Sequence, residues 1–566
     1  MTLIQWFIFF AVVQLVHFAG TWRLYQKAGK KWWQALIPVY NAIILMDIIR
    51  RPRWWVVLLF IPVINLMMFP VVWIETLRSF GKNSPLDTAL GLLTFGVYTY
   101  TINYSDKVSY QADRSLQPRT AFGEWINAML FAIIAATLVH NYFIQPYIIP
   151  TGSLEKTLMI GDFLFVSKFH YGARTPTTAV AFPMVHDTLP VVGTKSYIDF
   201  PQLPYFRLPG FQKIERNEIV VFSWPADTVR RFFVREKGVR KPIDKKSNYV
   251  KRCVGIPGDT LQIIDGFVHI DGKQTDLPER AKTQYIHYGY NKKGVSSRML
   301  QKIGVKDFVR KYRIENITQE RYDAILPYIH GRLNNDLDNF IVITPPAGIP
   351  SKVVAQQGLR ISELLETKKE LTLTIAEANE LRNKSLFDSL VRKVNSRQTP
   401  NTSLFPNALP YAWNEDNFGP IVLPKAGTTI TLTPENLPLY KRIIREYEGN
   451  TLALQQGQII VNDQPTDQYT FTQDYYWMMG DNRHKSEDSR YWGFVPENHI
   501  VGKPVFIWFS IEGINDGIRN WRIRWDRIMT TVKGEGKPIS FFPYFIVAVV
   551  LWQIVSFIRK RKNTTA

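Results

Sequence analysis

The apolar segments of this chain lie toward its two ends and enclose a long polar region, and this layout constrains the fold more than any other feature. Residues 2–20, about 125–143 and 541–558 are each apolar over roughly the length that crosses a bilayer as a helix. The first segment has no basic region before it and further apolar segments after it, so we do not expect a cleavable leader. The pattern predicts an integral membrane protein with a large water-soluble part.

Three weaker apolar segments lie between the first two strong ones. Residues 54–74 predict a full span, and residues 86 to about 103 predict a weaker one. Residues 32–49 are interrupted by Pro38, Asn41 and Asp47, which favours an interfacial or re-entrant helix. We therefore expect a membrane module with three or four spans over residues 1–120, followed by a transmembrane anchor over 121–146.

Basic residues flank the polar region on the far sides of the spans that border it. Lys107, Arg114 and Arg119 precede the span at 125–143, and the run 559–562 follows the last span. Because Lys and Arg gather on the cytoplasmic side, both signals place the polar region outside. The net charge of +21 is otherwise dispersed and forms no basic-aromatic reading motif. We expect a lipid bilayer as partner and no nucleic acid.

The polar region divides by residue pattern. Residues 147–274 and 451–515 carry apolar runs bounded by turn residues and predict two parts of one mainly β domain. Residues 275–450 are richer in charge and predict an α+β insertion of unknown role, with a helical passage at 374–394 that Thr374 and Glu377 open as a capping box. Residues 516–540 read as a basic linker, and residues 541–566 as a C-terminal transmembrane helix with a basic tail.

Three short stretches, rich in polar residues and Gly or Pro, interrupt the apolar runs of the β domain. Ser153 follows Gly152, which allows a sharp turn that presents the hydroxyl beside its own N–H. Lys251 lies inside an apolar run, although a lysine in a strand ordinarily points to solvent. Residues 480–493 pack charges and hydroxyls between aromatics, as a salt-bridged loop also would. An isolated Thr-Gly-Ser is usually a surface turn, so no stretch is decisive alone.

The remaining side chains offer no other chemistry. Cys253 is the single cysteine, so no disulfide can form within the chain and no cysteine-based metal site is expected. No metal-ligand cluster or phosphate-binding glycine loop is visible. We expect neither a metal nor a cofactor.

Taken together, the stretches resemble the type I signal peptidase family in its bacterial serine–lysine form. The family pattern PSGSMxPTLxxGD is similar to residues 150–162, KRxxGxPGD to 251–259, GDNRxxSxDSRxWG to 480–493, and GDIVVF to 217–222. Thr151, Leu154 and Lys156 depart from the usual serine, methionine and proline. Residues 1–120 are also similar to a small membrane module found on varied proteins, a resemblance that implies no activity.

The resemblance implies a signal-peptidase-type β fold and an endopeptidase that removes signal peptides from exported preproteins after A-x-A-like sites. Ser153 would be the nucleophile and Lys251 the base, which requires a lysine pKa far below its ordinary value near 10.4. The Ser153 N–H and the Thr151 hydroxyl would form the oxyanion hole, and Ser486 would orient the amine. The other implied positions are Tyr147, Ile149, Pro150, Tyr249 and Val250 for substrate, and Asp481, Arg483, Asp488 and Arg490 for structural support.

This family works at the outer face of the bacterial inner membrane, so the resemblance implies a multi-pass protein with its catalytic domain on the periplasmic side. Preprotein signal peptides, and the protein export machinery with them, are the expected partners. Two alternatives remain open. A Ser/His protease would use His170, His484 or His499 as base, and a non-catalytic membrane scaffold would bind partners through the insertion.

Overall fold

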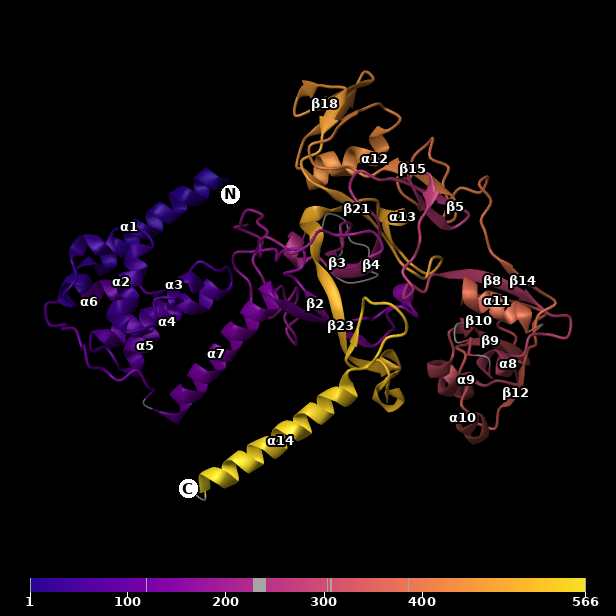
Figure 1. Ribbon diagram of the computed structural model, residues 1–566, viewed down its shortest axis with the longest axis horizontal. Helices are drawn as coiled ribbons and strands as arrows, with labels where there is room; N and C mark the ends of the chain where they lie inside the picture. The colour runs from indigo at the N-terminus through magenta and orange to yellow at the C-terminus, as the bar shows by residue number, and fades with distance from the viewer. Residues whose placement is uncertain are drawn as a thin grey trace.

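The computed structural model describes residues 2–118, 120–227, 241–302, 304–305, 308–384 and 386–564. Arg119, the side chains of the basic run 559–562 and the last two residues of the predicted tail lie outside the described residues. Figure 1 shows three regions along the chain: a helical module at the N-terminus, a β domain in the middle and a mixed region formed by the predicted insertion.

The N-terminal module is helical and has a small core of its own. Its helices are α1 (Leu3–Lys27), α2 (Tyr40–Ile49), α3 (Trp55–Leu58), α4 (Ile64–Ser79), α5 (Pro85–Leu93) and α6 (Thr99–Tyr104), and α7 (Ala121–Tyr142) leads out of it. Within the described ranges, two helices are long and apolar enough to cross a membrane, α1 and α7. Only 6% of the apolar window of each is buried in the protein, which is consistent with a membrane protein.

The two further spans predicted at 54–74 and 86–103 are wrong as continuous helices. The first is divided between α3 and α4, where Pro62 lacks a backbone N–H and Val63 has φ of 69°. The second is divided between α5 and α6, where Phe95 and Gly96 both have positive φ. Residues 32–49 are interrupted as predicted, with a 3-10 turn (Trp32–Ala35) and α2 separated at Pro38 and Val39.

A nine-stranded sheet forms the centre of the β domain. Its main path runs β1-β2-β23-β3-β4-β21-β22, and the short strands β24 and β25 pair with β23. The pairs on this path are antiparallel. The strands are β1 (Ile144–Ile148), β2 (Asp162–Ser167), β3 (Ile219–Ser223), β4 (Asn248–Gly255), β21 (Tyr475–Met479), β22 (Val495–Pro496), β23 (Ile500–Glu512), β24 (Arg522–Ile523) and β25 (Thr530–Thr531). The sheet therefore joins residues from both predicted parts of the domain.

Smaller sheets extend the β domain. The predicted apolar run at 260–270 is a hairpin of β5 (Thr260–Ile264) and β6 (Phe267–Ile270), whose turn residues Asp265 and Gly266 both have positive φ, as a tight hairpin requires. The remaining elements here are β7 (Lys273–Gln274), β15 (Phe418–Val422), β16 (Thr429–Thr431), α12 (Leu437–Arg442), β17 (Leu452–Gln455), β18 (Gln458–Val461), β19 (Gln464–Pro465), β20 (Gln468–Thr470) and α13 (Ser489–Trp492). Because β15 pairs with β5, the end of the predicted insertion packs into this domain.

The rest of the predicted insertion contains two small sheets. One joins β13 (Lys368–Thr374), β8 (Gln284–Tyr290) and β14 (Ser389–Arg392). The other joins β10 (Gly331–Arg332), β11 (Asn339–Thr344), β9 (Arg310–Glu315) and β12 (Arg360–Glu363), with helices α8 (Ser297–Lys302), α9 (Gln319–Ile325) and α10 (Ser351–Gln356) beside them.

The helical passage predicted at 374–394 is correct only in its first half. The capping box of Thr374 and Glu377 opens α11, which spans Ile375–Asn383. The second half forms β14 instead, in which Leu390 is buried and Val391 is exposed. Pairing with β8 makes this segment a strand, because its local propensity alone does not specify its secondary structure.

The last helix, α14 (Phe542–Thr564), leaves the β domain by itself. Figure 1 shows α7 and α14 extending from the β domain on the side away from the insertion. The large apolar side chains of α14 are exposed, including Trp552 at 70%. Both helices thus extend away from the β domain in this view.

Candidate active site

The turn that carries Ser153 follows directly from β1. Two backbone hydrogen bonds join Ile149 to the residues just before and at the start of β2, from the Ile149 N–H to Asp162 and from the Gly161 N–H to Ile149. The chain is then extended at Thr151 and turns as a 3-10 helix over Gly152–Leu154. Among the described residues the Ser153 N–H has no hydrogen-bond partner, so it is available to an incoming oxygen.

Lys251 reaches this turn from β4, between β3 and β21 at the middle of the sheet. Its amine donates a 2.6 Å hydrogen bond to the Ser153 hydroxyl. The side chain is only 5% exposed. Burial lowers the pKa of Lys251 to about 8, against the opposing influence of the carboxylates of Asp488 and Glu487. A lysine in a strand usually points to solvent, but Lys251 instead points toward the turn that carries Ser153.

The stretch at 480–493 holds both groups in place. Gly480 passes so close to the turn that a Cβ there would lie 2.6 Å from the Ser153 carbonyl oxygen and 2.2 Å from the Ser486 hydroxyl oxygen. Only glycine allows this approach. The Asn482 N–H donates to the Ser153 carbonyl at 3.0 Å, and its side-chain amide donates to the Gly152 carbonyl at 3.2 Å.

Two buried ion pairs fix the backbone of that stretch. Arg252, next to Lys251, pairs with Asp481 at 2.6 Å, and Thr157 donates a hydrogen bond to the same carboxylate at 2.6 Å. Arg490 pairs with Asp488 at 2.8 Å and donates to the Arg483 carbonyl. All four charged residues of these pairs are at most 3% exposed. Removing one partner would leave a buried charge unpaired, so these pairs are suited to a supporting role.

The structure brings Ser486 to the site without the predicted contact to the amine. Its hydroxyl is buried and has no hydrogen-bond partner in the described part of the chain. Thr151 has an exposed side chain beside the turn. Arg483 contacts the Met479 sulfur rather than a carboxylate, and its Nε is buried without a partner among the residues described. The roles predicted for these three side chains stay predictions.

Of the predicted substrate positions, Tyr147 lies on β1, Ile149 and Pro150 follow it, and Tyr249 and Val250 lie on β4. Tyr249 stacks on Trp224 with ring centroids 5.1 Å apart, and the Lys251 amine lies 5.6 Å from the Tyr249 ring centre. Ile149 is 4% exposed and packs with Tyr147 and Val250 in one core cluster. Pro150 is exposed, and Asn515 donates a hydrogen bond to its carbonyl.

The three histidines that a Ser/His enzyme would require are engaged elsewhere. His484 pairs with Asp416 at 3.1 Å, His170 contacts the Ser167 hydroxyl, and His499 contacts Asn498. In the described ranges, none of them makes a hydrogen bond to Ser153. The geometry therefore favours lysine as the base.

Gln284 is a site residue that sequence reasoning missed. It begins β8 in the insertion and is fully buried. Its side-chain amide donates to the Glu155 carbonyl at 2.6 Å, just after the nucleophile turn, and its backbone joins both Asp481 and Arg483. Nearby, Lys156 pairs with Glu377 of α11. Since no motif surrounds Gln284, only its place in three dimensions identifies it.

Comparison with known proteins gives matches over the same part of the chain. The model of a family described as signal peptidase, peptidase S26, matches residues 122–320 and 466–509. A family of unknown function (DUF5684) matches residues 33–113 in the membrane module. The matched regions include Ser153, Lys251 and the stretch at 480–493.

Similar curated proteins carry the name signal peptidase I. One from Buchnera aphidicola subsp. Acyrthosiphon pisum is 24% identical over 396 residues, covering 70% of this chain and 77% of that protein. One from Rickettsia massiliae is 29% identical over 162 residues, covering 28% of this chain and 47% of that protein. The chain thus spans about half the length of the Rickettsia relative. The fold, the site and these matches define a serine endopeptidase. Over these residues the chain is similar to the signal peptidase family, peptidase S26.

Proposed function

We propose that this protein removes signal peptides from exported preproteins by cutting after A-x-A-like sites, with Ser153 as nucleophile and Lys251 as base. The observation that carries the proposal is the 2.6 Å hydrogen bond between a buried lysine amine and the Ser153 hydroxyl. A serine hydroxyl is a weak nucleophile without an adjacent base. A lysine can act as that base only when its amine is neutral, and burial favours the neutral form.

The reaction proceeds through an acyl-enzyme. The neutral Lys251 amine takes the Ser153 proton as the serine oxygen attacks the carbonyl carbon of the scissile peptide bond. The Ser153 N–H, with the Thr151 hydroxyl beside it, stabilises the resulting oxyanion. The tetrahedral intermediate then breaks the C–N bond, and the lysine ammonium returns the proton to the leaving amine. A water, deprotonated by the same amine, hydrolyses the ester and restores Ser153.

The substrate binds as an extended segment between β1 and β4. Strand-like pairing with the backbone near Ile149, Pro150 and Val250 supplies affinity, and side-chain pockets supply selectivity. Ile149 and Val250 pack in one core cluster, and we assign small substrate residues to the positions beside them. Preprotein signal peptides are therefore the substrate class that we assign.

The membrane anchors the enzyme next to its substrate. We assign α1 and α7 as transmembrane helices and α14 as a third, with the β domain on the periplasmic side of the bacterial inner membrane. The apolar part of a signal peptide lies in the same bilayer, so tethering raises the effective concentration at the active site. The export machinery that delivers preproteins is the expected neighbour.

Cleavage of a preprotein by the purified full chain tests the proposal. We expect the wild type to release the mature protein, and both Ser153→Ala and Lys251→Ala to lose at least about 1,000-fold in kcat, as for other nucleophile and base removals. Thermal unfolding of each variant in the same detergent verifies that it is folded. Equal cleavage by wild type and Ser153→Ala would overturn the assignment, as would a wild type that cuts no preprotein. Substantial activity of Lys251→His would instead indicate a base other than lysine.

A further inference from the structure

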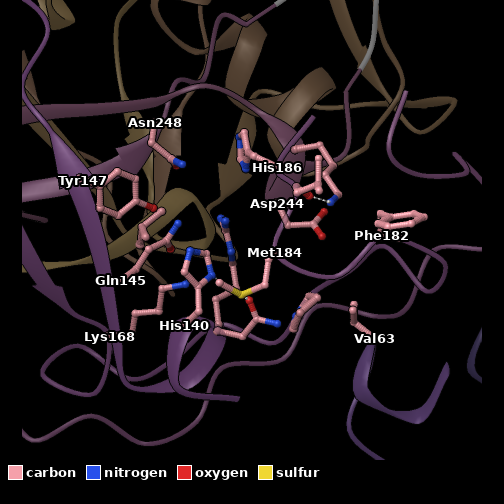
Figure 2. Close-up of a pocket in the computed structure, with 17 residues that line it drawn as sticks. Val63, His140, Gln145, Tyr147, Lys168, Phe182, Met184, His186, Asp244 and Asn248 are labelled. Carbon is pink, nitrogen blue, oxygen red and sulfur yellow. Dashed lines mark hydrogen bonds between the residues drawn. The ribbon is translucent and has the colours of Figure 1, made fainter. Parts of the chain in front are cut away.

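A polar cavity of about 170 Å³ lies between the end of α7 and the loop that precedes β3 (Figure 2). Three basic side chains line it, Lys168 from the residue after β2, Arg174 from the following loop and Lys245 from the turn before β4. His140 near the end of α7 and His186 lie beside them. Neither the catalytic mechanism nor any family motif uses these three basic groups.

The cavity has an unbalanced positive charge. Its lining includes one carboxylate, Asp244, whose oxygens accept hydrogen bonds from the hydroxyls of Thr177 and Thr178 and from the Thr178 N–H. Arg174 donates to the Asn498 carbonyl and to the Ser223 hydroxyl. These contacts leave three basic side chains against one carboxylate.

Lys168 is the group that lacks a partner. In the described part of the chain its amine makes no hydrogen bond or ion pair, although burial and the charge of Arg174 lower the pKa of Lys168 to about 7. A half-buried amine without partners is unfavourable, and an anion within hydrogen-bonding reach offsets that cost. In Figure 2 the Lys168 side chain extends into the cavity beside Gln145 and His140.

The cavity lies where three parts of the membrane module meet the β domain. The Trp6 indole, near the start of α1, donates a hydrogen bond to the Gln202 carbonyl. Val63, between α3 and α4, packs with Ala181 and Tyr197 and lines the cavity itself. The end of α7 supplies His140. Val63 and the end of α7 therefore lie at the cavity, and the start of α1 contacts the loop that precedes β3.

The rim of the cavity is apolar and open. Phe182 is 60% exposed and Met184 is 50% exposed, and both line the cavity; in Figure 2 Phe182 lies on the side away from Lys168 and Met184 lies between them. A cationic pocket bordered by exposed apolar side chains is complementary to a molecule with an anionic head and hydrocarbon tails. Free phosphate would use the cations and leave the apolar rim uncovered.

We propose that this cavity binds the phosphate of a phospholipid, with Lys168, Arg174 and Lys245 around the phosphate and the acyl chains against Phe182, Met184 and α7. The proposal rests on the membrane placement given under the proposed function. It does not depend on the dyad, which lies further along β1 and β4.

A substrate carboxylate is the competing occupant, because Tyr147 and Asn248 of the substrate strands also line the cavity. Asn248 precedes Lys251 by three residues, about 10 Å along a strand. An acidic residue a few positions before the cut could therefore reach Lys168. The contacts with α1, Val63 and α7 favour the lipid, since a substrate would require none of them.

Native mass spectrometry of the full chain, delipidated in detergent and titrated with lipid, tests the proposal. The probes are phosphatidylglycerol, diacylglycerol with the same acyl chains, and glycerol phosphate. We expect one phosphatidylglycerol to be retained and the other two to bind at least roughly tenfold more weakly, as the loss of charged hydrogen bonds predicts. Lys168→Gln should weaken phosphatidylglycerol retention by roughly tenfold, Lys168→Arg should restore it, and the exposed control Lys384→Gln should not change it.

Several outcomes would overturn the inference. Equal retention of diacylglycerol would show that the apolar rim alone binds, and equal binding of glycerol phosphate would show a free-phosphate site. Unchanged retention in Lys168→Gln would remove the cavity from the interaction. If that variant instead altered cleavage only of preproteins with Glu, not Gln, before the cut, the cavity would belong to the substrate. Ser153→Ala should retain lipid fully, so failure of the proposed protease function is measured separately.

Discussion

The burial of Lys251 affects both its reactivity and the stability of the fold. The packing around β4 excludes water from its amine, which lowers the pKa of Lys251 to about 8 and makes the neutral base accessible near physiological pH. The same burial disfavours the ammonium that exists at lower pH. The side chain is therefore suited to catalysis and unfavourable for stability.

The pH dependence of cleavage follows from the state of this amine. Because only the neutral amine can take the serine proton, kcat/KM should rise about tenfold per pH unit below about 8 and level off above it. The measurement is a pH–rate profile on a preprotein in detergent, at substrate concentrations well below KM. A rate that stays constant down to pH 6 would contradict lysine as the base.

The stability of the fold should respond to Lys251 in the opposite direction. The folded-state pKa of about 8 lies below the ordinary 10.5, so the unfolded chain binds more protons between these values and stability rises with pH across this window. Below pH 8 the full penalty is present, about 3 kcal/mol at most. Lys251→Met should therefore abolish cleavage and raise the melting temperature at pH 7.

The control for that prediction is the same variant at pH 10, where the native lysine is neutral in the folded state and the gain should shrink. A melting temperature below that of the wild type at pH 7 would show that the ammonium is accommodated without penalty. Thermal unfolding followed by intrinsic tryptophan fluorescence suits this chain.

At the scale of elements, the insertion contacts the active site through hydrogen bonds from β8. Gln284 begins that strand, and its amide bonds to the Glu155 carbonyl while its backbone bonds to Asp481 and Arg483. One residue thus links the turn that carries Ser153 to the stretch that supports Lys251. The position has no signal in the sequence, because a glutamine at the start of a strand in a charged region is unremarkable by itself.

Replacing Gln284 tests this linkage. Gln284→Ala leaves the Glu155 carbonyl without its buried partner, at a cost of about 1–3 kcal/mol, and loosens the Ser153 turn. We expect kcat to fall by roughly tenfold or more with little change in KM, because a poorly positioned nucleophile reacts slowly while substrate still binds. The pH midpoint should not move, since Lys251 stays buried. The exposed Gln356→Ala is the matched control, and a fall confined to KM would contradict a positioning role.

Secondary-structure elements also show where sequence patterns predict the fold correctly and where they do not. The hairpin of β5 and β6 was predictable because apolar alternation and an Asp-Gly turn specify it locally. The helix predicted through 389–392 is β14 because its pairing with β8 outweighs a pattern that suits a helix. The continuous span predicted at 54–74 is divided at Pro62 and Val63, where composition alone does not reveal the sharp turn.

At the scale of the whole molecule, the topology can be tested with single cysteines. The one native cysteine, Cys253, is fully buried and should give no background. Lys384→Cys, exposed at the end of α11, should react with a membrane-impermeant maleimide once the outer membrane is permeabilised. Lys107→Cys, exposed before α7, should react only after the inner membrane is disrupted. Reaction of both positions, or the reverse pattern, would contradict the assigned orientation.

The sequence by itself indicated the class of chemistry and helices that are consistent with a membrane protein. Length and apolar composition are read directly from a segment, and the residues around Ser153, Lys251 and 480–493 are a local signature that does not depend on long-range packing. Only the tertiary structure decided which distant groups meet. It brought Ser153 to Lys251, 98 residues apart in the chain, and left the predicted contact of Ser486 unmade. It also joined Gln284 to the stretches around Ser153 and 480–493. Lys168, Arg174 and Lys245 meet around one cavity for the same reason. These contacts depend on how strands far apart in the chain pair and pack, which no short stretch of residues encodes.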